Sequence, residues 1–249
     1  MEPFKNRIGG MEKLTMLDFP GKLAAILFYN GCNLRCPYCY NASLVKKEIV
    51  PIRHEEILQF LESRKGKIDG IVFSGGECTI WGSKLLTDIQ TVREMGYKVK
   101  VDTNGINSQF VIDAVNEGLI DYIALDIKAP RLGSCVHNFV NNPDKLTNPW
   151  ILLQWLISLK KVPFETRTTI HPDVTDEQDI GMLLKHLKDV GLNQKHHFQY
   201  FFETGETLGN VTQNPRYFDF NKVDTHGIEV GFRNEEQNNR RKVLEIQHG

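Results

Sequence analysis

Short apolar runs alternate with amphipathic segments along most of this chain of 249 residues. The apolar runs are rich in aliphatic and β-branched residues, as buried parallel strands are, and cover residues 23–30, 70–74, 98–103, 122–128, 164–170 and 198–203. The amphipathic segments between them repeat apolar residues at helical spacing and cover residues 54–64, 83–95, 109–117, 149–160 and 175–190. Strands that alternate with helices form parallel sheets with right-handed crossovers. The pattern predicts an α/β fold, best described as a TIM-like partial (β/α)6 barrel with an open lateral side.

Length and charge narrow the possibilities further. A chain of this size can bury one substantial core, and α/β barrels often reach it without dividing. The 30 Lys and Arg residues almost balance the 31 Asp and Glu residues, so no nucleic-acid partner is expected. No apolar run approaches a membrane-spanning length, and the start of the chain lacks a secretory apolar segment, so we expect a cytoplasmic protein without a membrane partner.

The expected barrel covers residues 1–203, and residues 204–249 form a C-terminal extension that packs on the same domain. Two regions stand outside the strand–helix pattern: an excursion at residues 129–148, and the polar extension itself, which contains one plausible strand at residues 227–233.

Chemically versatile side chains follow the expected strands at their carboxyl ends, the edge where parallel α/β folds place their sites. Because the candidates come from five different strands, their convergence is stronger support for a site than any single motif. In chain order they are Cys32, Cys36, Tyr38, Cys39, Gly75, Gly76, Glu77, Asp102, Thr103, Asp126, Lys128, Arg167 and His171.

Three cysteines, Cys32, Cys36 and Cys39, follow the first expected strand with the spacing C-x3-C-x2-C. Three thiolates on one loop can hold three irons of a 4Fe-4S cluster, and without a fourth cysteine nearby the last iron keeps an open coordination site. A structural zinc site fits this cysteine spacing less well, because such sites have four ligands and often two C-x2-C pairs. Disulfides are disfavoured by the odd total of five cysteines.

The Gly-Gly-Glu segment after the second expected strand has two interpretations. Gly75 and Gly76 can simply form a turn that requires positive φ. Alternatively, their bare backbone lets a ligand approach while Glu77 accepts hydrogen bonds from an ammonium group. Cys78 comes next and is either a fourth metal ligand or a small packing residue, of which packing is favoured; Cys135 is expected not to bind the cluster.

The remaining candidates are less specific. Asp102 and Asp126 follow apolar residues at strand ends, where a carboxylate is as often a cap or turn former as a ligand. Lys128 emerges on the same side of an extended strand as Asp126 and can pair with a carboxylate. Arg167 points either outward or into the barrel, and His171 is either a loop histidine or a ligand contact.

With the aromatic Tyr38 before its last cysteine, the cysteine loop resembles the signature of the radical S-adenosylmethionine (SAM) enzymes. This resemblance implies that the open iron is chelated by the amino and carboxylate groups of SAM. It also implies that the segment ending in Glu77 binds the amino group of the methionine, and that the backbone of Tyr38 contacts adenine. A cluster reduced by flavodoxin or ferredoxin then cleaves SAM into methionine and a 5′-deoxyadenosyl radical.

Further motifs resemble a narrower family. Residues 14–25 (LTMLDFPGKLAA), the Asp-Thr-Asn-Gly element at 102–105 and the Asp-x-Lys element of Asp126 and Lys128 resemble the activating proteins of anaerobic ribonucleoside-triphosphate reductase. The similarity is to their longer form, which is also similar to pyruvate formate-lyase activating enzyme. It covers residues 10 to about 203, with the specific motifs in the first half, and no eight-cysteine ferredoxin-like insert is present.

The narrower resemblance implies a single-cluster enzyme that takes a hydrogen atom from a backbone glycine of an anaerobic ribonucleotide reductase. Three alternatives stay open. The chain could activate another glycyl-radical enzyme, or be a radical SAM enzyme acting on a small molecule, peptide or RNA. A non-enzymatic iron–sulfur carrier or sensor is the third, although such proteins usually complete four ligands.

Overall fold

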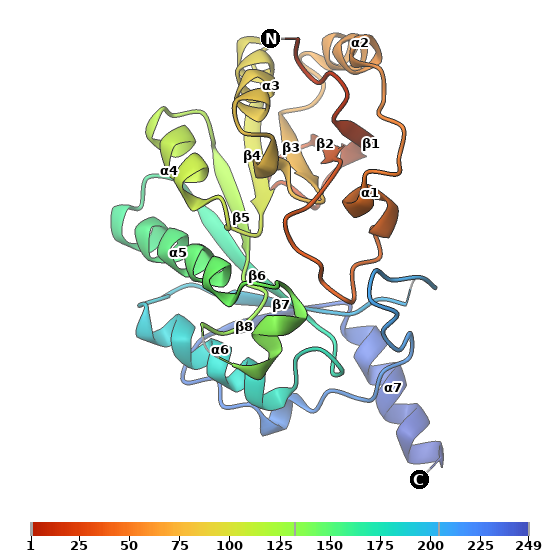
Figure 1. Cartoon of the computed structure of the whole chain (residues 1–249). Coiled ribbons are helices and arrows are strands. Elements are labelled where there is room, and N and C mark those ends of the chain that lie inside the picture. The colour runs from red at the N-terminus through yellow and green to blue at the C-terminus, as the bar shows by residue number, and fades with distance from the viewer. Residues whose placement is uncertain (1, 132, 204, 249) are drawn as a thin grey trace. The chain divides into compact units, whose positions relative to one another are not determined.

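The computed structural model describes residues 2–131, 133–203 and 205–248 of the chain (Figure 1). Leu132, in the expected excursion, and Thr204, where the expected extension begins, lie outside the described residues. The chain forms two compact units, of which the first comprises Met1–Asn33, Ser43–Ala124 and Leu159–Phe164, and the second comprises Leu34–Ala42, Leu125–Ser158 and Glu165–Gly249.

The first unit contains a sheet that begins with an antiparallel pair. Strand β1 (Ile8–Thr15) is antiparallel to β2 (Ala24–Tyr29), whereas β2 pairs in parallel with β3 (Gly70–Gly75) and β3 with β4 (Lys98–Thr103). Strands β2 and β3 are largely buried, which explains their continuous apolar runs. The sequence did not predict β1, because most of it is partly exposed and it contains two adjacent glycines.

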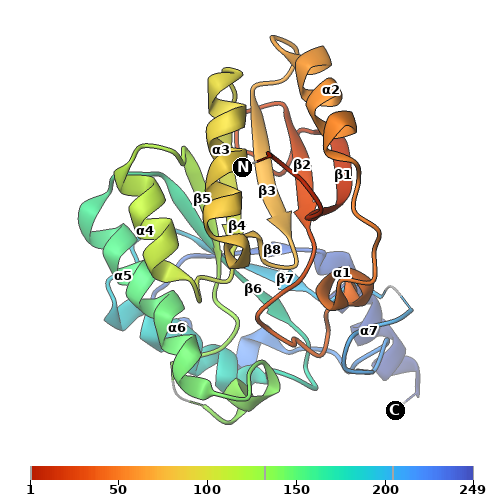
Figure 2. The same cartoon turned by 45° about the horizontal axis from the view of Figure 1, so that its top comes forward.

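Helices connect the parallel strands of this unit. They are α2 (His54–Arg64), the 3-10 helix η1 (Cys78–Trp81), α3 (Ser83–Glu94) and α4 (Ser108–Asn116), while the short α1 (Ala42–Lys46) starts at the unit boundary. Helix α3 runs beside β4 (Figure 2). The helices follow their apolar stripes, since α2 buries Ile57 and Leu61 against the unit.

One polar residue interrupts the buried stripe of α3. Asp88 is 0% exposed and accepts hydrogen bonds at 2.6 Å from both Nε and Nη2 of Arg7, and at 2.7 Å from the hydroxyl of Tyr29. The backbone N–H of Phe4 donates to the same carboxylate at 2.5 Å. This network attaches the N-terminal segment to α3, because a buried charge must be paired and hydrogen-bonded.

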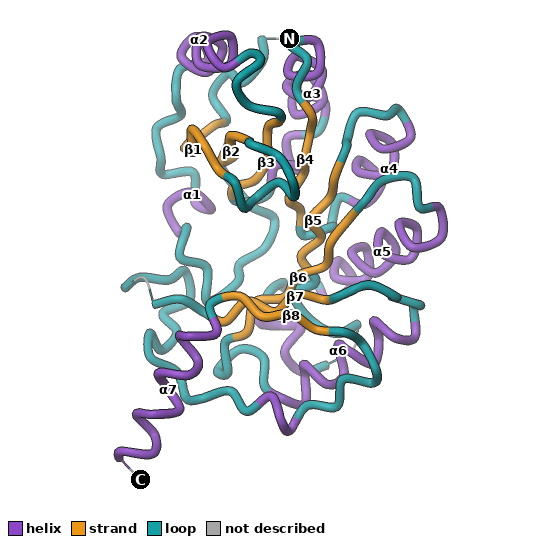
Figure 3. Tube along the Cα trace, turned by 180° about the vertical axis from the view of Figure 1, so that it is seen from behind, coloured by secondary structure: helices purple, strands orange, loops and turns teal. Residues whose placement is uncertain are grey.

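The second unit contains the end of β5 (Tyr122–Asp126), most of β6 (Phe164–Ile170), β7 (His196–Tyr200) and β8 (Val230–Arg233). The pairs β6–β7 and β7–β8 are parallel, and β7 and β8 run side by side (Figure 3). Stacked rings join the last two strands, since Tyr200 and Phe232 lie 5.6 Å apart between ring centroids.

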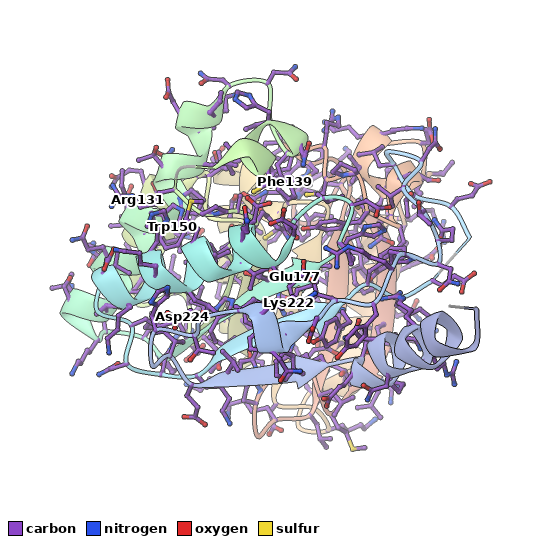
Figure 4. All side chains as sticks on the ribbon, turned by 90° about the horizontal axis from the view of Figure 1, so that it is seen from below. Arg131, Phe139, Trp150, Glu177, Lys222 and Asp224 are labelled. Carbon is purple, nitrogen blue, oxygen red and sulfur yellow. The ribbon has the colours of Figure 1, made fainter. Side chains whose placement is uncertain are left out.

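Helices α5 (Asn148–Leu159), α6 (Glu177–Asp189) and α7 (Glu235–His248) also belong to this unit, with 3-10 helices η2 (Ser134–Asn138), η3 (Pro143–Thr147) and η4 (Phe220–Lys222). A capping box formed by Asp176 and Asp179 starts α6. His186 of α6 contacts the ring of Trp150 at 5.8 Å and accepts a hydrogen bond from the backbone of Arg131. Figure 4 shows Trp150 and Arg131 next to α6.

The predicted alternation of parallel strands with helices is confirmed. Strand β7 starts two residues before the expected run at 198–203, because its first residues are histidines rather than apolar residues. The plausible strand at 227–233 is present as the shorter β8. Within the described ranges, each helix is too short or too polar to span a membrane.

Candidate functional site

The two glycines after β3 pack against the start of the cysteine loop. Gly76 donates its N–H to the carbonyl of Tyr29 at 3.0 Å, and Glu77 donates to the carbonyl of Gly31 at 2.9 Å. A Cβ on Gly76 would lie 2.1 Å from the Gly31 oxygen, and one on Gly75, where φ is +115°, would lie 2.2 Å from the Tyr29 nitrogen. Both glycines are therefore required for close contact with the protein's own backbone.

The carboxylate of Glu77 is 2% exposed and lies at the junction of β3, η1 and β4. It accepts hydrogen bonds from the N–H and hydroxyl of Thr79 at 3.2 and 2.6 Å, from the Thr103 hydroxyl at 2.8 Å and from the Asn104 N–H at 2.7 Å. Burial raises the pKa of Glu77, although these donors favour its charged form. Its contact with SAM stays a prediction.

Asn33 and Asn104 connect the cysteine loop to the end of β4, and sequence reasoning did not select either. The Asn104 side-chain N–H donates to Oδ1 of Asn33 at 2.7 Å, and Cys32 Sγ lies 4.0 Å from the same oxygen. Thr103 accepts a hydrogen bond from the Gly105 N–H at 3.0 Å. The element at residues 102–105 thus orders both Glu77 and the first part of the loop.

Lys100 is a second residue that sequence reasoning missed. It is 1% exposed, and its Nζ lies 2.6 Å from Oδ1 of Asp102, whose Oδ2 accepts from the Ser74 hydroxyl at 3.2 Å. The Lys100 ammonium also lies 5.9 Å from the ring centroid of Tyr122. The signal was present in the strand alternation, which places Lys100 and Asp102 on the same face.

Cys78 is fully buried behind this corner. Its Sγ lies 3.6 Å from the carbonyl oxygens of both Phe73 and Asp102, so the thiol can donate to either. Burial raises the pKa of the thiol well above its ordinary value. Because a metal ligand must be the thiolate, this environment supports a packing role for Cys78.

In the second unit, Asp126 accepts hydrogen bonds from two cations. Arg167 Nε donates to Oδ1 at 2.8 Å and Lys128 Nζ donates to Oδ2 at 3.2 Å. Burial disfavours the charged carboxylate, but Arg167 and Lys128 outweigh it and hold the pKa of Asp126 well below its ordinary range. Burial likewise opposes the charge on Lys128, yet Asp126 keeps the pKa of Lys128 raised. These three predicted residues therefore lie together.

Tyr38 is 5% exposed, and its ring packs edge-on against Phe139 at 5.9 Å. Among the described residues, its hydroxyl is one of the few buried side-chain atoms without a hydrogen-bond partner. Burial raises the pKa of that hydroxyl, while the charge of Lys128 acts to lower it. Leaving a buried hydroxyl unpaired costs about 1–3 kcal/mol. Such a group next to charged residues suits a site that takes a polar ligand.

His171 is 0% exposed, and both of its ring nitrogens have protein partners. Nε2 lies 2.9 Å from the carbonyl oxygen of Thr212, and the Asp173 N–H donates to Nδ1 at 3.3 Å. Since a carbonyl can only accept, Nε2 carries the proton. Burial lowers the pKa of His171, so the ring is held neutral. The structure places His171 as an anchor for residues near Thr212, and its contact with SAM stays a prediction.

None of the five cysteines, all of which lie within the described ranges, forms a disulfide. Cys32 belongs to the first unit, whereas Cys36 and Cys39 belong to the second. Across the described ranges, no three His, Cys, Asp or Glu side chains lie close enough to share one metal ion. A cubane cluster does not require this arrangement, because each of its cysteines binds a separate iron. The three loop thiols remain candidate cluster ligands because soft sulfur donors suit iron–sulfur clusters.

Comparisons with known proteins converge on one superfamily. Residues 26–194 match the family described as the radical SAM superfamily. A protein of Methanocaldococcus jannaschii assigned to the glycyl-radical enzyme activating enzymes is 32% identical over 198 residues, covering 78% of this chain and 81% of that protein. The pyruvate formate-lyase 1-activating enzyme of Escherichia coli strain K12 is 26% identical over 217 residues, covering 80% and 82%.

Solved structures show the same fold. Native anSMEcpe with bound AdoMet matches with a TM-score of 0.51 and 19% identity, covering 69% of this chain and 49% of that chain. TYW1 with a lysine-pyruvate adduct bound also has a TM-score of 0.51, with 14% identity, covering 77% and 69%. The chain thus spans about half the length of anSMEcpe. These likenesses confirm the predicted α/β fold of the radical SAM type.

Proposed function

Because this chain belongs to the radical SAM superfamily and is homologous to glycyl-radical enzyme activating enzymes, we propose that it installs a glycyl radical on an anaerobic ribonucleotide reductase. Enzymes of the superfamily use a 4Fe-4S cluster and SAM. When bound, these cofactors supply reductive cleavage of a carbon–sulfur bond and a radical that can take a hydrogen atom from glycine. We further propose that flavodoxin or ferredoxin is the electron donor.

The match to the activating enzymes carries the proposal, because it extends over 78% of this chain and 81% of the M. jannaschii relative rather than over the cysteine motif alone. Cys32, Cys36 and Cys39 would ligate the cluster and leave one iron for SAM. Their soft thiols suit iron–sulfur chemistry.

The charges of the two units fit the two ends of the methionine moiety. In the first unit, Glu77 and Asp102 carry two negative charges against the single cation of Lys100, which favours an ammonium group. In the second unit, the three cations Lys128, Arg167 and Arg233 face the two carboxylates of Asp126 and Glu165, which favours a further carboxylate. We propose that SAM's amino group binds at Glu77 and its carboxylate at Lys128 and Arg167.

The remaining predicted contacts have positioning roles in this scheme. Gly75 and Gly76 keep the cysteine loop close to β3, and Thr103 orients Glu77 through the 2.8 Å hydrogen bond from its hydroxyl. The backbone of Tyr38 would contact adenine, while its buried ring packs against Phe139. None of these groups needs to move a proton for hydrogen-atom transfer.

The hairpin at residues 14–25 presents apolar side chains at the start of β2, the end of that strand opposite the cysteine loop. Thr15 Oγ1 donates to Asp18 Oδ2 at 2.5 Å and also accepts from the Leu17 N–H, which fixes the turn. Phe19 is 2% exposed and packs in a small apolar cluster, while Met16 and Leu17 are 73% and 90% exposed. A rigid turn that presents two apolar side chains suits contact with a partner protein.

The test is to mix the reduced protein, SAM and the reductase from the same genome without oxygen, and to record the electron paramagnetic resonance doublet of a glycyl radical. Cys36→Ala is the control and should give no doublet. A parallel mixture with pyruvate formate-lyase addresses the second candidate, which the similarity to the E. coli enzyme favours. Cleavage of SAM without a radical on either partner would contradict the activase proposal.

A further inference from the structure

The second half of the cysteine loop is held by a segment whose role the proposed function leaves open. Within the second unit, the backbone N–H of Leu208 donates to the carbonyl of Cys39 at 2.9 Å, and that of Gly209 donates to the carbonyl of Pro37 at 2.8 Å. Two successive donors thus bind two carbonyls of the loop. The contact joins residues about 170 positions apart, so local sequence does not dictate it.

Gly209 lies directly against the loop. A Cβ at this position would lie 2.6 Å from both Cα and Cβ of Pro37 and 3.2 Å from its carbonyl oxygen. Real Cβ atoms do not approach backbone this closely, and a proline has little freedom to move away. Glycine is therefore required here by close approach rather than by backbone conformation.

Two further contacts fix this segment in place. The neutral ring of His171, at the end of β6, donates from Nε2 to the carbonyl of Thr212 at 2.9 Å. Phe201 covers the same ring, with centroids 4.7 Å apart, and its own carbonyl accepts from Arg241 of α7 at 2.8 Å. Residues 205–213, which we name the strap, are thus anchored to β6 on the side of Thr212.

The excursion holds the same loop through different residues. The Arg35 N–H donates to the carbonyl of Phe139 at 3.0 Å, and the ring of Phe139 packs against Tyr38. Figure 4 labels Phe139, and its side chain is 1% exposed. Pro37 and Cys39 are thus bound by the strap, while Arg35 and Tyr38 are bound by the excursion.

We propose that the strap, together with Phe139, holds the backbone around Cys36 and Cys39 in place for cluster binding, so that Gly209 and His171 are positioning residues for the cluster. The proposed ligands are three cysteines, so this assignment gives the cluster no fourth protein ligand. A loop that is already ordered loses less conformational entropy when it binds its ligand, and cluster retention should depend on that order. The inference rests on the proposed cysteine ligands.

The first test uses Gly209→Ala in the reconstituted protein. We expect the added methyl group to displace the strap from Pro37 and to raise the rate of iron loss to a chelator on the order of 10-fold, the scale at which outer-shell changes act on metal sites. The electron paramagnetic resonance spectrum of the reduced cluster should also change. Gly181→Ala is the matched control, because a Cβ there meets no atom within 4 Å. Equal loss rates in Gly209→Ala and wild type would overturn the proposal.

The second test separates positioning from general stability at His171. His171→Leu removes the donor to Thr212 and should raise the rate of iron loss several-fold, whereas His171→Gln offers an amide N–H near the position of Nε2 and should restore most of the retention. Thermal unfolding of both variants without the cluster reports any shared loss of stability. If Gln and Leu lose iron at the same rate, His171 does not act through the strap.

The third test measures hydrogen exchange in the wild-type protein, so it does not depend on whether a substituted protein folds. Cluster binding should slow hydrogen exchange at the amides of Leu208 and Gly209 several-fold, because a bound cluster stabilises the closed strap by mass action. Unchanged exchange at both amides would overturn the proposal. If Cys36→Ala retained the cluster, that result would refute the proposed cysteine ligands. It would not test the role of the strap.

Discussion

Two buried carboxylates of the candidate site have different kinds of hydrogen-bond donor. Glu77, in the first unit, accepts four hydrogen bonds from neutral hydroxyl and backbone donors. Asp126, in the second unit, accepts from the cations of Arg167 and Lys128. Burial raises the pKa of Glu77, whereas the two cations outweigh burial and lower the pKa of Asp126. Neutral donors satisfy hydrogen bonds without fully offsetting a buried charge, and cations do both.

The contrast has a consequence for ligand binding. A carboxylate surrounded by neutral donors still gains from a cation, so an ammonium group arriving at Glu77 should lower its pKa again. A carboxylate that is already paired with two cations gains little from a third cation. Lys128 and Arg167, however, can each donate a hydrogen bond to a second anion. Substitutions at Glu77 and at Lys128 or Asp126 should therefore have different effects on SAM binding and on stability.

The largest effect is expected at Cys32, Cys36 and Cys39, because each would ligate one iron of the proposed cluster. Anaerobic reconstitution should give about four irons and four sulfides per chain, and alanine at any of the three positions should abolish the cluster. Cys78→Ala is the matched control and should retain it. Iron and sulfide analysis gives the answer, and cluster loss in Cys78→Ala would refute the three-ligand assignment.

A substitution in either unit should lower the affinity for SAM while the cluster stays intact. Glu77→Gln removes a charge-assisted acceptor and Lys128→Ala removes a cation, so each should weaken SAM binding by roughly 1.5–3 kcal/mol. Equilibrium binding of SAM to the reconstituted variants measures the loss. Lys185→Ala, at a 57% exposed side chain paired with Asp189, serves as the control. Unchanged affinity in both site variants would mean that the charge argument is wrong.

The predictable parts of this molecule depend on local pattern. The runs at residues 70–74 and 98–103 are apolar or alternating, and they appear as β3 and β4 with nearly the expected bounds. Asp126 and Lys128 were expected on one side of a strand end, and their 3.2 Å contact agrees with that expectation. Periodicity within one strand sufficed for these features.

The features that sequence reasoning missed depend on distant partners. Lys100 looks like a surface residue beside the exposed Lys98, yet it is buried, with its ammonium against the carboxylate of Asp102 and near the ring of Tyr122. His171 was interpreted as either a loop histidine or a ligand contact, and its hydrogen bond to Thr212, 41 residues away, was not foreseen. Strand alternation could have indicated the Lys100–Asp102 pair, whereas a single sequence carries no information about a pairing such as His171 with Thr212, because that pairing follows from tertiary packing.

A double-mutant cycle on stability should show that Asp126 and Lys128 form an ion pair. Asp126→Ala leaves Arg167 and Lys128 as neighbouring like charges and should destabilise the protein without its cluster by about 1–3 kcal/mol, between the values for exposed and for fully buried ion pairs. Adding Lys128→Ala should recover part of that loss, since one unpaired cation is then removed. Denaturant unfolding of the wild type, both single variants and the double variant measures the coupling. Strict additivity would contradict direct pairing.

The smallest effect is expected in the pH dependence of stability, where the two carboxylates should act with opposite signs. The pKa of Asp126 is lowered from 3.8, so its contribution is present above 3.8 and is lost as the pH falls toward its folded pKa. The pKa of Glu77 is raised from 4.5, so its contribution is present below 4.5 and is lost as the pH rises through its folded pKa. Asp126→Asn should therefore flatten the stability curve below pH 3.8, and Glu77→Gln should flatten it above pH 4.5.

Urea unfolding of the protein without its cluster, from about pH 3 to 7, compares these slopes with those of the wild type. The same change in both variants would show that neutral donors and cations hold the two carboxylates alike, and reversed signs would contradict the pKa directions argued for Asp126 and Glu77.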